Sequence, residues 1–116
     1  MIDIDATDFF TGRKFLDALL AREGGRCFYC LRAVRRETRE LDHVTPRVDG
    51  SDNSYRNIVV SCHDCNSQKQ GSQGDEFLRG LYRRGVLSQR KLEERLATLE
   101  SLKAGQLGSV ALRPSV

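Results

Sequence analysis

The first periodic pattern of apolar residues lies in the N-terminal part of the chain. Apolar side chains recur there every three or four positions, which predicts a helix over about residues 8–23 that ends at Gly24 and Gly25. This helix leads the chain directly to Cys27. Its apolar stripe consists of Phe15, Leu16, Leu19 and Leu20.

A second helical pattern occupies the C-terminal part and predicts two helices within about residues 75–104. Gly85 separates them, and Ser88 is the expected N-cap of the second. A stripe of four leucines on one face is typical of core packing. A contact between two copies of the chain is the alternative, which leaves open a homodimer through the C-terminal helix. The four leucines are Leu92, Leu96, Leu99 and Leu102.

Between these helices, the apolar period shortens to that of β-strands. Leu41 and Val44 indicate a first strand, and the β-branched run at residues 58–60 indicates a second. The connection between them is rich in Pro, Gly, Asp, Ser and Asn, which predicts a wide loop. A short helix is expected to follow through Cys65 and to end at Gly71. The predicted fold class is therefore α+β, a two-stranded hairpin plus a helix with flanking helices on both sides.

Length and composition limit the class of protein. A chain of 116 residues is one small domain, and 39% hydrophobic with 30% charged residues excludes a membrane protein and an extensively disordered chain. The N-terminus carries acids where a signal peptide carries basic residues, and no apolar run approaches the roughly 20 residues that cross a bilayer. We therefore expect a cytoplasmic location and no membrane partner. In that reducing compartment, paired cysteines bind metal more often than they form disulfides.

The charge of the chain permits a nucleic-acid partner without requiring one. The formal net charge is +3 and the sequence pI is about 8.8. Several arginines stand close together before the first strand, and an ordinary solvated surface is the simpler interpretation of them. They are Arg32, Arg35, Arg36 and Arg39.

Two C-x-x-C pairs indicate a metal site. Cys27 and Cys30 form the first pair, Cys62 and Cys65 the second. Four thiolates at this spacing suit tetrahedral Zn²⁺, and a site closed by four protein ligands is structural because no position remains for substrate. The alternative is four buried cysteines without metal. His63 lies within the second pair and is expected to be exposed.

Further residues join the cysteines in a recognisable order: Cys27-x-x-Cys30, Leu41-Asp42-His43-Val44-x-Pro46, Gly50, Asn57-Ile58-Val59 and Cys62-x-x-Cys65-Asn66-x-x-Lys69. This arrangement resembles the HNH family of ββα-metal nucleases, in the zinc-containing branch with two C-x-x-C knuckles. The resemblance covers residues 27–69, within a motif core at about residues 27–71 of a single domain over residues 1–116.

The resemblance implies a role for each matching residue. His43 corresponds to the general base, and Asp42 and Asn66 to ligands of a catalytic divalent ion. Asn57 corresponds to the residue that holds the loop between the strands through backbone hydrogen bonds. Because Asp42 and Asn66 offer hard oxygen ligands, Mg²⁺ or Mn²⁺ is the expected ion. Asp42 and His43 are neighbours on a strand and point to opposite faces, so both can serve one site only if the strand end is distorted.

The expected function is a metal-dependent endonuclease that hydrolyses DNA phosphodiester bonds, with RNA not excluded as a substrate. Arg47, Arg56 and Lys69 are candidate phosphate contacts, although each is equally well explained as surface charge. The alternative function is a catalytically inactive, zinc-stabilised nucleic-acid-binding module. Retention of the residues at positions 42, 43 and 66 favours the enzyme.

Overall fold

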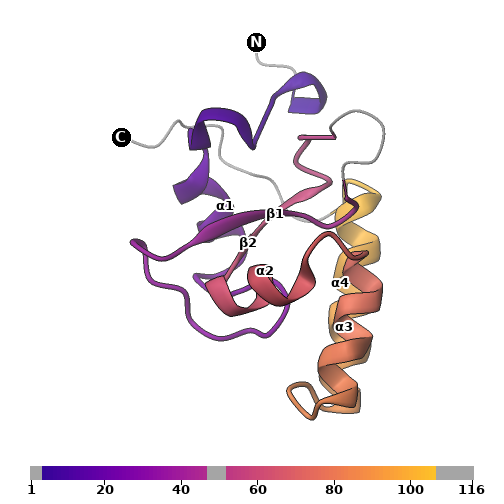
Figure 1. Cartoon of the computed structure of the whole chain (residues 1–116). Coiled ribbons are helices and arrows are strands. Elements are labelled where there is room, and N and C mark those ends of the chain that lie inside the picture. Colours follow the sequence, from indigo (N-terminus) through magenta and orange to yellow (C-terminus); the bar gives the residue numbers. More distant parts are fainter. Residues whose placement is uncertain (1–3, 47–51, 107–116) are drawn as a thin grey trace.

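The computed structural model describes residues 4–46 and 52–106 (Figure 1). An antiparallel two-stranded hairpin lies at the centre, and a pair of helices packs beside it at the C-terminal end. The α+β fold class is thereby confirmed. The elements in chain order are η1 (Ile4–Ala6), η2 (Thr11–Arg13), α1 (Leu16–Arg22), β1 (Glu40–His43), β2 (Ile58–Ser61), α2 (His63–Lys69), α3 (Gly74–Arg83) and α4 (Gln89–Lys103).

The hairpin fixes which residues share a face. In the register of the two strands, Asp42 stands opposite Val59 and His43 opposite Ile58. Helix α2 packs against β1, and α1 packs against β2. Strand β2 is buried along its whole length, which explains its run of β-branched residues. Strand β1 is only partly buried, and it presents the charged and polar side chains of the candidate site.

The outer edge of β2 is covered by side chains from the end of α1. The Glu23 carboxylate accepts the backbone N–H of Val60 at 2.9 Å, and Arg22 donates to the carbonyl of Ile58 at 2.8 Å. The N–H of Phe28 donates to the carbonyl of Val60 at 3.0 Å. Arg22 Nη2 and Glu23 Oε2 also lie 3.3 Å apart, and both side chains are buried. These groups satisfy the buried backbone of β2 in place of a third strand.

The N-terminal helix is shorter than the sequence pattern predicts. We expected it over about residues 8–23, but α1 begins at Leu16, and only the short η2 turn precedes it. Gly12 and Arg13 have left-handed backbone angles, φ +76° and +55°, which a continuous α-helix cannot contain. The residues before α1 are thereby released to contact other parts of the chain.

The C-terminal helices agree closely with the prediction. Gly85 has a left-handed φ of +78° between α3 and α4, and the Ser88 hydroxyl caps α4 by accepting the N–H of Lys91 at 3.1 Å. None of the helices in the described part of the chain is long and apolar enough to cross a membrane.

The leucine stripe of α4 packs on the chain's own core. Leu99 and Leu102 are buried, and Leu92 and Leu96 are partly buried against the same core. The leucines that could have formed a homodimer contact therefore pack within one chain, and the structure gives no support to that homodimer.

Gly74 connects the C-terminal helices to the end of β1. Its N–H donates to the carbonyl of Val44 at 2.8 Å, and a Cβ at this position would stand only 3.3 Å from the same oxygen. This close approach favours glycine. The hydrogen bond places the start of α3 beside Val44, the residue that follows His43.

Candidate active site and metal centre

The four cysteines form one compact cluster. Their sulfur atoms all lie within 4.8 Å of one another, and the Sγ atoms of Cys30 and Cys62 are 3.8 Å apart. Four sulfurs at about 2.3 Å from a tetrahedral Zn²⁺ would be separated by about 3.8 Å. All four cysteines are free thiols. The cluster could therefore hold a zinc ion, as the two C-x-x-C pairs predict.

Backbone and sulfur contacts within the cluster also suit a cation. The N–H of Tyr29 donates to Cys27 Sγ, and the N–H of Cys65 donates to Cys62 Sγ, each at 3.4 Å. A hydrogen bond with Cys30 raises the pKa of Cys27 to about 12, and a hydrogen bond with Cys27 raises the pKa of Cys65. The hydrogen bond with Cys27 lowers the pKa of Cys30. The cluster thus stabilises negative charge on the Cys30 sulfur, and a bound cation would favour loss of the protons that the other thiols retain.

Asn57 closes the connection between the two strands. Its side-chain oxygen accepts the N–H of Thr45 at 2.9 Å, and its amide donates to the carbonyls of Thr45 at 3.1 Å and Asp52 at 2.9 Å. Asn57 is 3% exposed, so these three bonds satisfy a buried amide. They hold both ends of the loop that follows His43.

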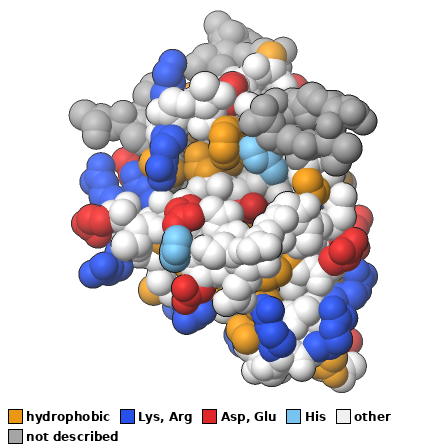
Figure 2. Space-filling view, in the orientation of Figure 1, with side chains coloured by type: hydrophobic (Ala, Val, Ile, Leu, Met, Phe, Trp, Pro, Cys, Tyr) orange, Lys and Arg blue, Asp and Glu red, His pale blue; other side chains and the backbone are white. Residues whose placement is uncertain are grey.

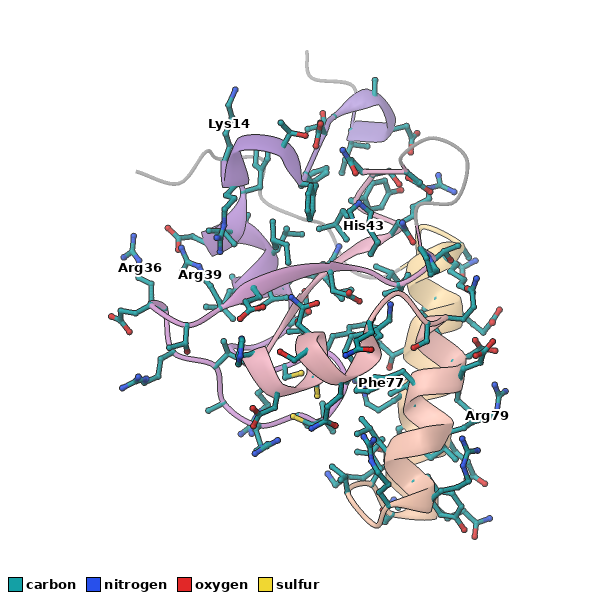
Figure 3. The ribbon with its side chains drawn as sticks, in the orientation of Figure 1. Lys14, Arg36, Arg39, His43, Phe77 and Arg79 are labelled. Carbon is teal, nitrogen blue, oxygen red and sulfur yellow. The ribbon has the colours of Figure 1, made fainter. Side chains whose placement is uncertain are left out.

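His43 occupies the last position of β1, at the opposite end of the strand from Arg39 (Figure 3). Its Nε2 atom lies 2.8 Å from the side-chain oxygen of Asn53, and its ring centroid lies 4.4 Å from that of Phe10. The imidazole is only partly buried. Figure 2 shows both histidines of the chain on the same face of the molecule.

Asp42 is more enclosed than a ligand of an exposed ion would be. It is 8% exposed, and its Oδ2 atom accepts the Tyr29 hydroxyl at 2.5 Å and pairs with Lys69 Nζ at 3.2 Å. Burial, together with the charge of Asp42, raises the pKa of Tyr29, so the phenol remains a donor. These bonds use Oδ2 and leave Oδ1 as the candidate ligand atom.

Lys69 faces the interior of the domain. Besides pairing with Asp42, its Nζ atom donates to the carbonyl of His43 at 2.8 Å, and the residue is 2% exposed. This burial argues against the phosphate contact that the sequence analysis expected of Lys69. The side chain instead neutralises Asp42 and fastens α2 to the end of β1.

Asn66 contacts Glu40, an acid for which the sequence motif predicts no role. Its amide donates to Glu40 Oε1 at 2.6 Å, and His63 Nδ1 lies 2.6 Å from Glu40 Oε2. Burial alone would raise the pKa of Glu40, but hydrogen bonds from Asn66 and His63 hold it below its ordinary value. The signal was present in the sequence, because Glu40 stands two residues before Asp42 and so shares its strand face. His63 is exposed, as expected.

The candidate site thus has two parts. Asp42 pairs with Lys69 of α2, and Asn66 of α2 contacts Glu40 of β1. The His43 side chain instead contacts Asn53 and Phe10, in line with the alternation of neighbouring side chains along a strand. Within the described residues, no hydrogen bond or ion pair joins the side chains of His43, Asp42 and Asn66 to one another. Asp42 Oδ1 and Asn66 Oδ1 are hard oxygen donors that fit Mg²⁺ or Mn²⁺.

A groove of about 650 Å³ opens beside Asn66. Its walls come from two separate segments, residues 10–13 before α1 and residues 37–41 leading into β1. The N-terminal segment therefore contributes to the surface next to the candidate site.

The remaining basic candidates differ in their surroundings. The Arg56 side chain is 43% exposed and pairs with Asp5 at 3.2 Å. Arg47 lies outside the described residues. In the arginine cluster before β1, Arg36 and Arg39 both pair with Asp17, at 3.4 and 2.7 Å. Arg36 is exposed, as an ordinary surface residue would be, whereas Arg39 is buried, contrary to the solvated surface expected for the cluster.

Comparison with known families identifies the central segment. Residues 27–72 match the family model described as HNH endonuclease. Residues 27–72 are an HNH domain. This domain contains both cysteine pairs, the hairpin and α2, and its relationship confirms the resemblance seen in the sequence.

The chain is similar to short parts of much longer proteins. It is 39% identical over 49 residues to the "CRISPR-associated endonuclease Cas9" of Corynebacterium diphtheriae, covering 41% of this chain and 4% of that protein. It is 38% identical over 58 residues to the protein of the same name from Actinomyces naeslundii, covering 49% and 5%. The crystal structure of the Type II-C Cas9 enzyme from Actinomyces naeslundii has a TM-score of 0.49 and 27% identity, covering 88% of this chain and 12% of that chain.

Proposed function

We propose that the chain is a metal-dependent endonuclease, formed as one domain around the HNH segment, that hydrolyses phosphodiester bonds of DNA. The observation that supports this most is the HNH match over residues 27–72, with His43, Asn57 and Asn66 held on its hairpin and helix. RNA remains a second substrate class that the same chemistry would attack.

His43 is the proposed general base. An imidazole suits this role near neutral pH, and His43 is partly exposed at a strand end. It takes a proton from a water molecule whose oxygen forms a bond to phosphorus. The electron pair of the broken P–O bond passes to the leaving 3′ oxygen, which is protonated by solvent water.

Asp42 and Asn66 would hold the catalytic ion through their Oδ1 atoms. A bound Mg²⁺ or Mn²⁺ supplies electrostatic stabilisation of the charge that develops on the phosphate and the leaving oxygen. Lys69 and Tyr29 hold the Asp42 carboxylate through Oδ2, and Glu40 accepts a hydrogen bond from the side-chain amide of Asn66. These three residues therefore orient the two proposed ligands.

The four cysteines are proposed to hold a structural Zn²⁺. Their site is closed by four protein ligands, so it stabilises the fold and takes no part in hydrolysis. Arg56 and Arg47 are proposed to contact phosphates near the active site, and Arg56 is sufficiently exposed to do so.

One observation favours a second candidate function. Asp42 is already neutralised by Lys69 and enclosed by Tyr29, which agrees with a zinc-stabilised nucleic-acid-binding module that does not cut. An endonuclease and a module that only binds DNA predict different outcomes when the protein is mixed with the same DNA.

The deciding experiment is incubation of the protein with supercoiled plasmid and Mg²⁺ or Mn²⁺. We expect nicking that EDTA stops, that His43→Ala abolishes and that the exposed α3 substitution Arg79→Ala leaves unchanged. General-base catalysis contributes about 10²–10⁴-fold, enough to remove detectable cutting. Binding of DNA without any metal-dependent nicking would instead support the binding module.

A further inference from the structure

The N-terminal segment before α1 reaches into the active site from outside the HNH match. Backbone N–H of Phe9 donates to the carbonyl of Asn53 at 2.8 Å, and the Phe10 ring packs on His43. The side-chain amide of Asn53 donates to Asp8 Oδ2 at 3.2 Å. Asp8, Asn53 and His43 therefore form a continuous chain of side-chain hydrogen bonds.

The direction of this chain follows from Asp8. An ionised carboxylate only accepts hydrogen bonds, so the Asn53 atom that faces Asp8 is its nitrogen. The opposite atom, Oδ1, then faces His43 Nε2 at 2.8 Å. Because Oδ1 of an amide only accepts, Nε2 must carry the hydrogen. In a neutral imidazole this leaves the lone pair on Nδ1.

Asp8 is itself held by the backbone. The N–H groups of Phe10 and Thr11 both donate to Asp8 Oδ1 at 2.8 Å. Burial would raise the pKa of Asp8, but these bonds lower it to about 2, so the carboxylate is ionised and acts as an acceptor. The left-handed angles at Gly12 and Arg13 then turn the chain away toward α1.

We infer that Asp8 and Asn53 are positioning residues for His43, which hold its hydrogen on Nε2 and leave Nδ1 to take the proton from water. This inference rests on the proposed function for the role of Nδ1, while the position of the hydrogen rests on geometry alone. It gives residues 8–10, which lie outside the HNH match, a role in the active site.

The first test is nitrogen NMR of the His43 imidazole in the zinc-loaded full chain without DNA. Wild type is expected to show hydrogen on Nε2 only. Asn53→Ala and Asp8→Ala are expected to give a mixture of both tautomers, whereas Asp8→Asn keeps an accepting oxygen and most of the preference. Asp5→Asn is the matched control, since it removes an acid of the same segment that pairs with Arg56, and it should not change the spectrum.

The second test is nicking kinetics with the same variants. Asn53→Ala should lower kcat about 10- to 100-fold with KM for plasmid nearly unchanged, the effect typical of losing an orienting partner. Asp8→Asn should stay within about threefold of wild type, since one hydrogen bond of slightly different strength is involved. If Asp8→Ala does not fold, Asp8→Asn and Asn53→Ala still decide the matter.

Two results would overturn the inference: hydrogen on Nδ1 in wild type, or an Asn53→Ala variant with wild-type tautomer and kcat. Absence of nicking by wild type, with hydrogen found on Nε2, would refute the proposed nuclease function and leave the assigned tautomer supported.

Discussion

At the scale of single residues, the site depends on partners placed behind the proposed ligands. Glu40 is the clearest case, because one carboxylate receives the amide of Asn66 and the imidazole of His63. The motif residues in the sequence predict a role for Asn66 but none for Glu40. Sequence order alone could not pair them, since the contact arises only when α2 packs against β1.

The first residue-scale prediction concerns Glu40. Glu40→Ala frees the Asn66 amide to rotate and should weaken Mn²⁺ binding about 10-fold or more, whereas Glu40→Gln retains an accepting oxygen and should bind nearly as wild type. Electron paramagnetic resonance of added Mn²⁺ measures both. Glu37→Gln, an exposed acid on the same groove, is the matched control. Equal losses in the Ala and Gln variants would mean that the carboxylate binds the ion directly.

The second residue-scale prediction concerns the buried ion pair of Lys69 and Asp42. Lys69→Met leaves Asp42 without its cation and should lower the free energy of unfolding by about 3–5 kcal/mol. Combining it with Asp42→Asn removes the unpaired charge and should restore much of that loss. Urea unfolding of the two single variants and the double variant tests this, and purely additive effects would contradict it.

At the scale of elements, the strands, the short helix after them and the C-terminal helices could be predicted from the sequence. Their signals are local: β-branched runs, Gly85 as a break and Ser88 as a cap. The start of α1 could not be predicted, because an apolar stripe does not reveal the left-handed angles at Gly12 and Arg13. The link from Asp8 to His43 was equally hidden, since it joins segments far apart in sequence.

The element-scale prediction uses the carboxylate that covers the edge of β2. Burial raises the pKa of Glu23 to about 8, from about 4.5 in the unfolded chain. Between these values the folded chain keeps a proton that the unfolded chain loses, so stability should fall as pH rises from about 4.5 to about 8. Glu23→Gln cannot lose that proton, and its stability should fall less, by at least about 1 kcal/mol over the window. Parallel urea-midpoint curves for both proteins would refute this.

At the scale of the whole molecule, the cysteine cluster ties the segment before β1 to the start of α2. The core is small, and the hairpin alone is too short to be stable in isolation. We therefore predict about one tightly held zinc per chain, and unfolding when a strong chelator removes it. Metal analysis with circular dichroism measures both. A folded protein with less than about half an equivalent of zinc would contradict the prediction.

The side chains that cover the edge of β2 also affect how separate copies of this protein interact with one another. A strand with unsatisfied backbone groups at its border is a template on which other chains assemble, and such assembly ends in insoluble aggregates. Here the polar side chains of Arg22 and Glu23 cover that border and form hydrogen bonds with its backbone groups. The same two residues that complete the fold therefore protect the protein from aggregation. Substitution of either should lower the yield of soluble protein more than it lowers the nicking activity of the molecules that remain soluble.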